Sequence, residues 1–159
     1  MVYDASRDRS VLFGGNTTFG GTPSAQIWDW DTTSSTTGTW TQRCTGGSPC
    51  AGTAPSARAY HAMAYDRIRG VSVLWGGSVA DDNVYEFNGA GAGTWTRIIP
   101  SDPEADGSPV SRQGARMVYD EQRRKVLLFG AADFDAAPCD VVPRPASCGD
   151  SANGGSAPA

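Results

Sequence analysis

The sequence predicts an all-β fold built from repeats of a four-stranded unit, and three observations lead to this prediction. One short phrase occurs three times, as MVYD at Met1–Asp4, MAYD at Met63–Asp66 and MVYD at Met117–Asp120. The runs between turn residues are short and rich in Val, Tyr, Trp, Phe and Thr, which favour strands. No stretch keeps the i, i+3, i+4, i+7 spacing of apolar residues for long enough to make a helix.

Each copy of the phrase opens a unit of similar layout. A short basic turn follows it, and then comes an apolar run that ends in small residues. These runs are VLFGG at Val11–Gly15, VLWGG at Val73–Gly77 and LLFGA at Leu127–Ala131. The copies start 62 and 54 residues apart. A period near 50 residues indicates a repeat architecture.

The first two units continue with a third and a fourth run. The third run is IWDWD at Ile27–Asp31 and VYEFN at Val84–Asn88, and the fourth is TWTQR at Thr39–Arg43 and TWTRI at Thr94–Ile98. Four short strands at this period are the layout of one β-propeller blade. Blades stack face to face, so a middle strand covered on both faces should be apolar throughout, as Val71–Trp75 nearly is.

The order of these features resembles the kelch repeat, in which a diglycine ends the second strand and an aromatic residue precedes a Trp on the following strands. The matching residues are Gly14, Gly15, Trp28 and Trp40 in unit one, and Gly76, Gly77, Tyr85 and Trp95 in unit two. The resemblance covers roughly residues 1–131 and looks like kelch-type propellers of bacterial surface and secreted proteins. Unit three departs from the pattern, because its second glycine is Ala131 and no aromatic third strand or TWT fourth strand follows.

The resemblance implies kelch-like blades over residues 1–43 and 58–98, half a blade over 113–131, and a Cys-containing tail rich in Pro, Gly, Ser and Ala over 132–159. Propellers close with about 4–8 blades, so this chain predicts an incomplete ring whose outer faces expose apolar surface. Three arrangements remain open: a piece of a longer propeller, assembly with copies of itself or another chain, or further strands from the tail. The first is favoured, because Met1 itself occupies a repeat position.

Four cysteines lie in two loops rich in Gly, Ser and Pro. Their spacings are C-x5-C and C-x8-C, whereas paired zinc ligands are usually two to four residues apart. We therefore expect two local disulfides, Cys44–Cys50 and Cys139–Cys148. Disulfides persist in oxidising compartments, which predicts an exported protein that is extracellular, on the cell surface or periplasmic.

The two ends of the predicted strands differ in character. The turns between the first and second strands hold more than half of the Lys and Arg residues, beside acidic neighbours, and predict local ion pairs. Asp4, Asp66 and Asp120 are expected to hydrogen-bond the backbone of these turns. The opposite end carries long loops, where binding usually resides. The candidate binding rim consists of the acidic residues of these loops: Asp81, Asp82, Asp102, Glu104, Asp106, Asp133 and Asp135.

Catalysis finds little support, and the sequence names no catalytic residue, cofactor or metal ligand. The single histidine, His61, shares a strand face with Met63 and Tyr65 and is expected to pack between blades. One histidine argues against the copper site of some kelch-like oxidases, and no GxSxG elbow or phosphate-binding glycine motif is present. In IWDWD, the Asp residues predict an exposed face opposite a buried aromatic one, with a sugar-stacking platform as the alternative.

The net charge and the hydropathy of the sequence argue against some classes of partner. A net charge of −4 argues against general attraction to nucleic acid or anionic membranes, and no run of 18 apolar residues predicts a membrane span. We expect a non-enzymatic binding module of an exported bacterial propeller whose loop-rich rim engages a protein or a glycan. Two alternatives remain. One is a structural subunit whose open blade faces dock to neighbouring chains, and the other is a scaffold portion of a larger propeller enzyme.

Overall fold

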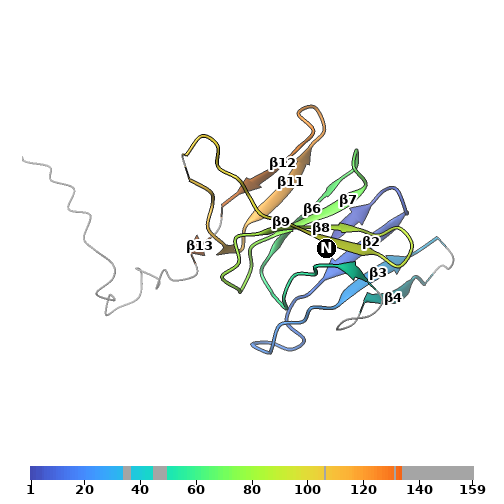
Figure 1. Cartoon of the computed structure of the whole chain (residues 1–159). Helices are drawn as coiled ribbons and strands as arrows, with labels where there is room; N and C mark the ends of the chain where they lie inside the picture. The colour runs from blue at the N-terminus through green and yellow to red at the C-terminus, as the bar shows by residue number, and fades with distance from the viewer. Residues whose placement is uncertain (34–36, 45–49, 106, 131, 134–159) are drawn as a thin grey trace, which may run out of the picture.

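The computed structural model describes residues 1–33, 37–44, 50–105, 107–130 and 132–133. Within these ranges the chain contains strands β1 to β13 and no helix. Two antiparallel meanders and a hairpin stand side by side in chain order, and among the described residues no sheet closes into a barrel (Figure 1). The prediction of an all-β, incomplete arrangement of four-stranded meanders is confirmed.

The first sheet is a meander of four strands in the order β1-β2-β3-β4. Its strands are β1 (Val2–Asp4), β2 (Arg9–Phe13), β3 (Ile27–Asp31) and β4 (Thr39–Cys44). They overlap the four predicted runs, and β2 ends at Phe13, before the diglycine of the second run. Each run is rich in strand-forming residues, and each boundary falls at turn residues.

The second sheet repeats this meander and adds a fifth strand. It contains β6 (Ala62–Asp66), β7 (Val71–Trp75), β8 (Val84–Asn88) and β9 (Thr94–Ile98). The added strand, β5 (Ala51–Gly52), runs parallel to β9 at the outer edge. It belongs to the segment that joins the two meanders, so the first connection also extends the second sheet.

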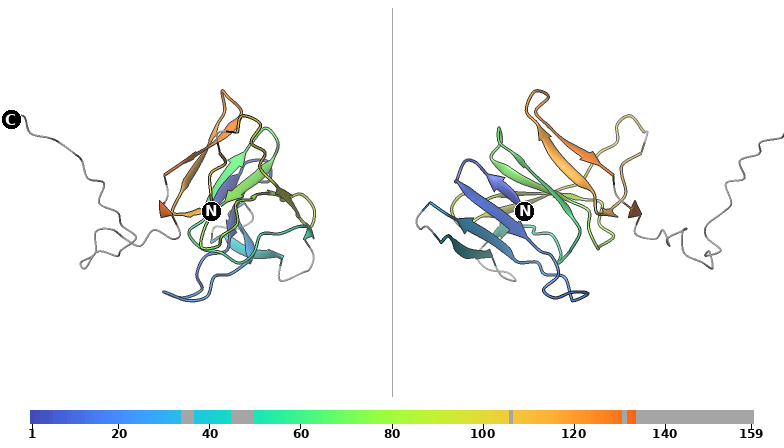
Figure 2. Two further views of the ribbon diagram at one scale, coloured as in Figure 1. Left: turned by 60° about the vertical axis from the view of Figure 1, so that its left-hand side comes forward. Right: turned by 180° about the vertical axis from the view of Figure 1, so that it is seen from behind.

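The third unit is a hairpin of β11 (Arg116–Asp120) and β12 (Lys125–Phe129). A short antiparallel pair, β10 (Arg112–Gln113) with β13 (Ala132–Asp133), lies beside it. The described part of the chain ends at Asp133, the last residue of β13, so the expected absence of a third and a fourth run lies outside the described residues. Figure 2 shows the hairpin beside the second sheet and the first sheet on the other side.

The basic turns that close β1–β2, β6–β7 and β11–β12 share one design. The carboxylate of Asp66 accepts hydrogen bonds from the amides of Ile68 and Arg69, each at 3.0 Å, and pairs with the Arg69 guanidinium at 2.6 Å. Asp4 and Asp120 make the same contacts in their own turns. The predicted role of the recurring aspartates, which is to hold the turn backbone, is confirmed.

The main hydrophobic core lies between the first two sheets rather than inside either one. Val11, Phe13 and Ile27 of the first sheet pack against one face of the second, and the rings of Phe13 and Trp95 are 5.3 Å apart edge to face. A smaller core joins the second sheet to the hairpin through Trp75 and Ala115. Each sheet therefore depends on its neighbour for burial of its apolar residues.

The diglycines form the joint between consecutive sheets. Gly14 and Gly76 have φ of 59° and 70°, in the left-handed region. A Cβ atom on Gly14 would lie 2.5 Å from the carbonyl oxygen of Arg58, and one on Gly76 would lie 2.6 Å from that of Arg112. Glycine is therefore required at these positions for two reasons, the positive φ and the close approach of the two backbones.

Candidate functional site

The described acidic residues of the predicted binding rim do not form one cluster. Asp82 accepts a hydrogen bond of 2.5 Å from the amide of Ser111, and Asp102 accepts one of 2.9 Å from the amide of Gly107. Glu104 is exposed, and Asp133 belongs to β13. Asp106 and Asp135 lie outside the described residues. In the part of the chain that is described, no three His, Cys, Asp or Glu side chains converge as metal ligands would.

Asp81 is engaged with the fold rather than displayed to a ligand. Its carboxylate accepts hydrogen bonds from the Arg58 guanidinium at 2.6 Å and the Tyr85 hydroxyl at 2.8 Å. Burial alone would raise the pKa of Asp81, but hydrogen bonds from Arg58, Tyr85 and Asn83 outweigh it and lower the pKa to about 2. Arg58 is fully buried, with 0% of its side chain exposed, so Asp81 supplies the counter-charge that this arginine requires.

His61 packs between the first two sheets, in agreement with the sequence. Its ring meets that of Phe13 edge to face at a centroid distance of 5.6 Å. Burial, reinforced by the charges of the amino terminus and Arg58, lowers the pKa of His61 to about 4. The imidazole is therefore neutral near pH 7.

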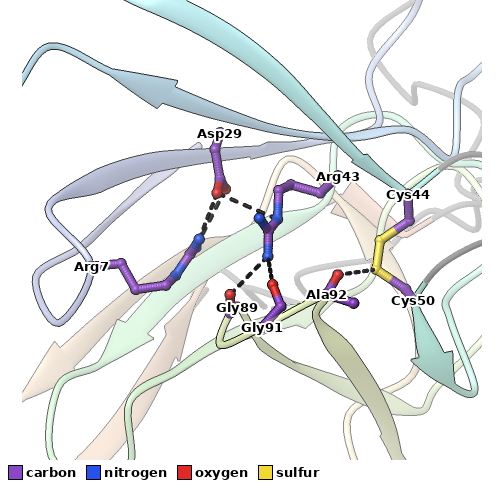
Figure 3. Close-up of a disulfide and its surroundings, with 8 residues drawn as sticks. All are labelled: Arg7, Asp29, Arg43, Cys44, Cys50, Gly89, Gly91 and Ala92. Atoms are coloured by element: carbon purple, nitrogen blue, oxygen red, sulfur yellow. Dashed lines mark hydrogen bonds and ion pairs between the residues drawn. A yellow bond between two sulfur atoms is a disulfide. The ribbon is translucent and has the colours of Figure 1, made fainter. Parts of the chain in front are cut away.

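The predicted bond between Cys44 and Cys50 is present, with the two Cα atoms 5.4 Å apart. Cys44 ends β4 of the first sheet, and Cys50 immediately precedes β5 at the edge of the second sheet. The disulfide therefore links the outer edges of two consecutive sheets (Figure 3). The second predicted pair, Cys139 and Cys148, lies outside the described residues.

A polar clasp lies next to this disulfide. The carboxylate of Asp29 is 2.5 Å from the Arg7 guanidinium and 3.5 Å from that of Arg43. Arg43 also donates hydrogen bonds to the carbonyl oxygens of Gly89, at 2.9 Å, and Gly91 in the second sheet's β8–β9 turn (Figure 3). Arg43 thus connects the two sheets through a charge and the backbone.

The structure overturns the predicted orientation of β3. Asp29 is only 4% exposed and faces the second sheet, whereas the opposite, aromatic face of β3 is the uncovered one. The reason is the position of the neighbouring sheet, which covers the Asp29 face, while Arg7 and Arg43 neutralise the buried carboxylate. On the uncovered face, Trp28 and Trp30 are half-buried and Trp40 is 46% exposed.

This uncovered face has a buried counterpart one repeat later. We call the uncovered face of the first sheet the open aromatic face, and it comprises Leu12, Trp28, Trp30 and Trp40. The residues at the same repeat positions in the second sheet are Leu74, Tyr85, Phe87 and Trp95, and all four are buried against the first sheet. A hollow of about 290 Å³ on the open aromatic face is lined by Leu12, Trp28 and Trp40.

The opposite end of the array is also uncovered. The hairpin exposes Val118, Leu127 and Phe129, of which Phe129 is 80% exposed. Leu127 and Phe129 occupy the repeat positions of Val11 and Phe13, which are buried under the second sheet. The two ends of the array thus expose the two kinds of face that pack together between the first and second sheets.

No protein-family description matches the sequence, and no curated protein shows significant similarity to it. Among the described residues there is no helix with the length and apolar character needed to cross a bilayer.

Proposed function

We propose that this chain is a non-enzymatic interaction module, a segment of an exported kelch-like propeller that docks to a neighbouring chain through its open blade faces. The observation that carries this proposal is the open aromatic face. Its residues are exposed or half-buried, whereas their counterparts one repeat later form the main core. Covering a large apolar side chain contributes about 1.5–3 kcal/mol, so this face favours association.

The occupant that fits best is a second copy of this chain. In the core between the first two sheets, Val11 and Phe13 supply the surface on which Trp95 and its neighbours pack. The hairpin carries Leu127 and Phe129 at those same positions and leaves them exposed. The hairpin of one copy can therefore cover the open aromatic face of another, in a head-to-tail contact that joins two different surfaces.

The kelch-like assignment rests on the repeat itself. Two four-stranded antiparallel meanders, each with a diglycine after its second strand and a Trp on its fourth, support it. Export is supported by the Cys44–Cys50 disulfide, since such bonds are rare in reducing compartments. A non-enzymatic role is supported by the position of His61, the only histidine of the sequence, whose ring packs against Phe13 between the first two sheets.

The test is the mass of the protein in solution, measured by sedimentation equilibrium over a wide range of concentrations. We expect the mass to rise with concentration for the natural chain, and we expect the Trp30→Ser/Trp40→Ser double variant to remain a monomer. Ile68→Ser, which alters an exposed apolar residue in the β6–β7 turn, is the control and should associate normally. A natural chain that stays monomeric throughout, or association that the double variant leaves unchanged, would refute the proposal.

A further inference from the structure

Tyr60 has an unusual backbone conformation for its residue type. Its φ is 58°, in the left-handed region that costs a residue with a Cβ atom free energy. The corresponding position before the hairpin is Gly114, whose φ is 73°. The fold therefore requires left-handed backbone at this repeat position. Glycine meets the requirement in one repeat, and a tyrosine occupies the same position in the other.

The surrounding backbone holds Tyr60 in this conformation. Its carbonyl oxygen accepts a hydrogen bond of 2.9 Å from the amide of Gly114. The preceding residue, Ala59, accepts one of 2.8 Å from the amide of Ser78 and donates one of 2.9 Å to the Ser78 hydroxyl. Strain of this kind persists where the environment imposes it, and it gathers at ligand sites.

The side chain of Tyr60 is displayed rather than buried. It is 59% exposed and lines an open pocket of about 460 Å³ on the loop-rich rim. The β2–β3 loop supplies the facing residues, Asn16, Thr18 and Phe19. Phe19 is fully exposed, and the Asn16 side-chain amide donates a hydrogen bond of 3.4 Å to the Tyr60 hydroxyl. We call this site the rim pocket.

The chemistry of the rim pocket selects a class of ligand. None of the described side chains that line it carries a charge, so no ionic group is favoured there. Two aromatic rings offer apolar faces, while an amide and two hydroxyls offer hydrogen bonds. A sugar ring matches both kinds of group, because the C–H groups on its faces pack on aromatic rings and the hydroxyls at its edge form hydrogen bonds. We propose that the rim pocket binds a neutral saccharide.

This site is separate from the open aromatic face. The rim pocket lies between the β2–β3 loop and the segment that leads into β6, and it shares no residue with Leu12, Trp28, Trp30 or Trp40. Saccharide binding and association between copies are therefore independent properties, and the failure of one leaves the other intact.

The decisive variant is Tyr60→Gly, because it installs the residue that the next repeat already uses at this position. It removes the aromatic ring and relieves the left-handed strain, so the fold should be retained or stabilised. Phe19→Ala removes the second ring from an exposed loop position. Ile68→Ala, in a turn at the other end of the strands, is the matched control for loss of an exposed apolar side chain.

The measurement is isothermal titration calorimetry with neutral oligosaccharides of glucose, mannose, xylose, galactose and N-acetylglucosamine. We expect at least one series to bind the natural chain, and we expect Tyr60→Gly and Phe19→Ala each to weaken binding about tenfold or more, as loss of an aromatic contact does. Ile68→Ala should bind as the natural chain does. The proposal is overturned if no series binds, if Tyr60→Gly leaves the affinity unchanged, or if a neutral proline-rich peptide binds where every oligosaccharide fails.

Discussion

The amide of Gly15 donates a hydrogen bond of 2.9 Å to the carbonyl oxygen of Arg58, which lies at the start of the segment leading into the next sheet. One repeat later, the amide of Gly77 donates to the carbonyl oxygen of Arg112 at 2.8 Å. The second glycine of each pair thus bonds to the following repeat, while the first brings the two backbones close. The diglycine is the joint that sets one sheet against the next.

The first prediction tests this joint by a pair of matched substitutions. Gly76 and Gly130 have nearly equal φ, 70° and 72°, but a Cβ atom on Gly76 would lie 2.6 Å from the Arg112 carbonyl oxygen, whereas one on Gly130 would meet no atom of the described residues within 4 Å. Gly130→Ala should cost about 1–2 kcal/mol of unfolding free energy for the backbone alone. Gly76→Ala should cost about 1–3 kcal/mol more, because the backbones must separate.

The free energies of unfolding come from urea titrations followed by tryptophan fluorescence. Equal losses for the two alanine variants would mean that the sheets do not approach as closely as the structure indicates.

The second prediction compares two tryptophans at the same repeat position. Trp95 is 2% exposed in the core between sheets, whereas Trp40 is 46% exposed on the open aromatic face. Trp95→Ala should destabilise the fold by about 3–5 kcal/mol, because it removes a large buried side chain and leaves a cavity. Trp40→Ala should cost about 1 kcal/mol or less in dilute solution. The free energy of unfolding of both variants is measured by urea titration at low protein concentration. Similar losses of this free energy would show that Trp40 does not lie on an uncovered face.

The third prediction concerns the disulfide between the outer edges of the sheets. Replacing Cys44 and Cys50 together with serine should lower the free energy of unfolding by about 2 kcal/mol, the chain-entropy value for a short closed loop. In a Cys139→Ser/Cys148→Ser background, which removes the second predicted pair, dithiothreitol should lower the stability by the same amount, and it should leave the variant that lacks all four cysteines unaffected. A thiol titration under denaturing conditions, before and after reduction, verifies that the bond was present.

The fourth prediction is a dependence of stability on pH through His61. Its pKa in the folded state is about 4, below the ordinary value of 6.5, so the unfolded chain binds more protons between these two pH values. The contribution of His61 is complete above pH 6.5 and falls as the pH drops towards 4, by about 3 kcal/mol. Urea unfolding at several pH values measures the slope, and His61→Gln should flatten it between pH 6.5 and 4.5. An unchanged slope in that variant would show that other groups cause it.

Much of the fold could be predicted because it depends on local patterns. Runs such as Val71–Trp75 favour strands, and residues such as Asp66 favour turns, wherever they occur in the chain. The strands, and the repeat that they form, could therefore be predicted from the sequence. The Cys44–Cys50 bond followed from short spacing alone. The two-residue strand β5 could not be predicted, because it is too short to carry a pattern and depends on the free edge of β9.

By itself, the sequence determined that this chain is an all-β array of repeats, that its recurring aspartates hold turns and that its single histidine packs between them. Only the tertiary structure decided which face of β3 is covered, that Asp81 neutralises the buried Arg58, and that Tyr60 is displayed in a left-handed conformation. The physical reason is that alternation along a strand distinguishes two faces without saying which one meets a neighbour. Which face is buried depends on packing and charge contacts with segments that are distant in sequence, and a local pattern does not contain this information.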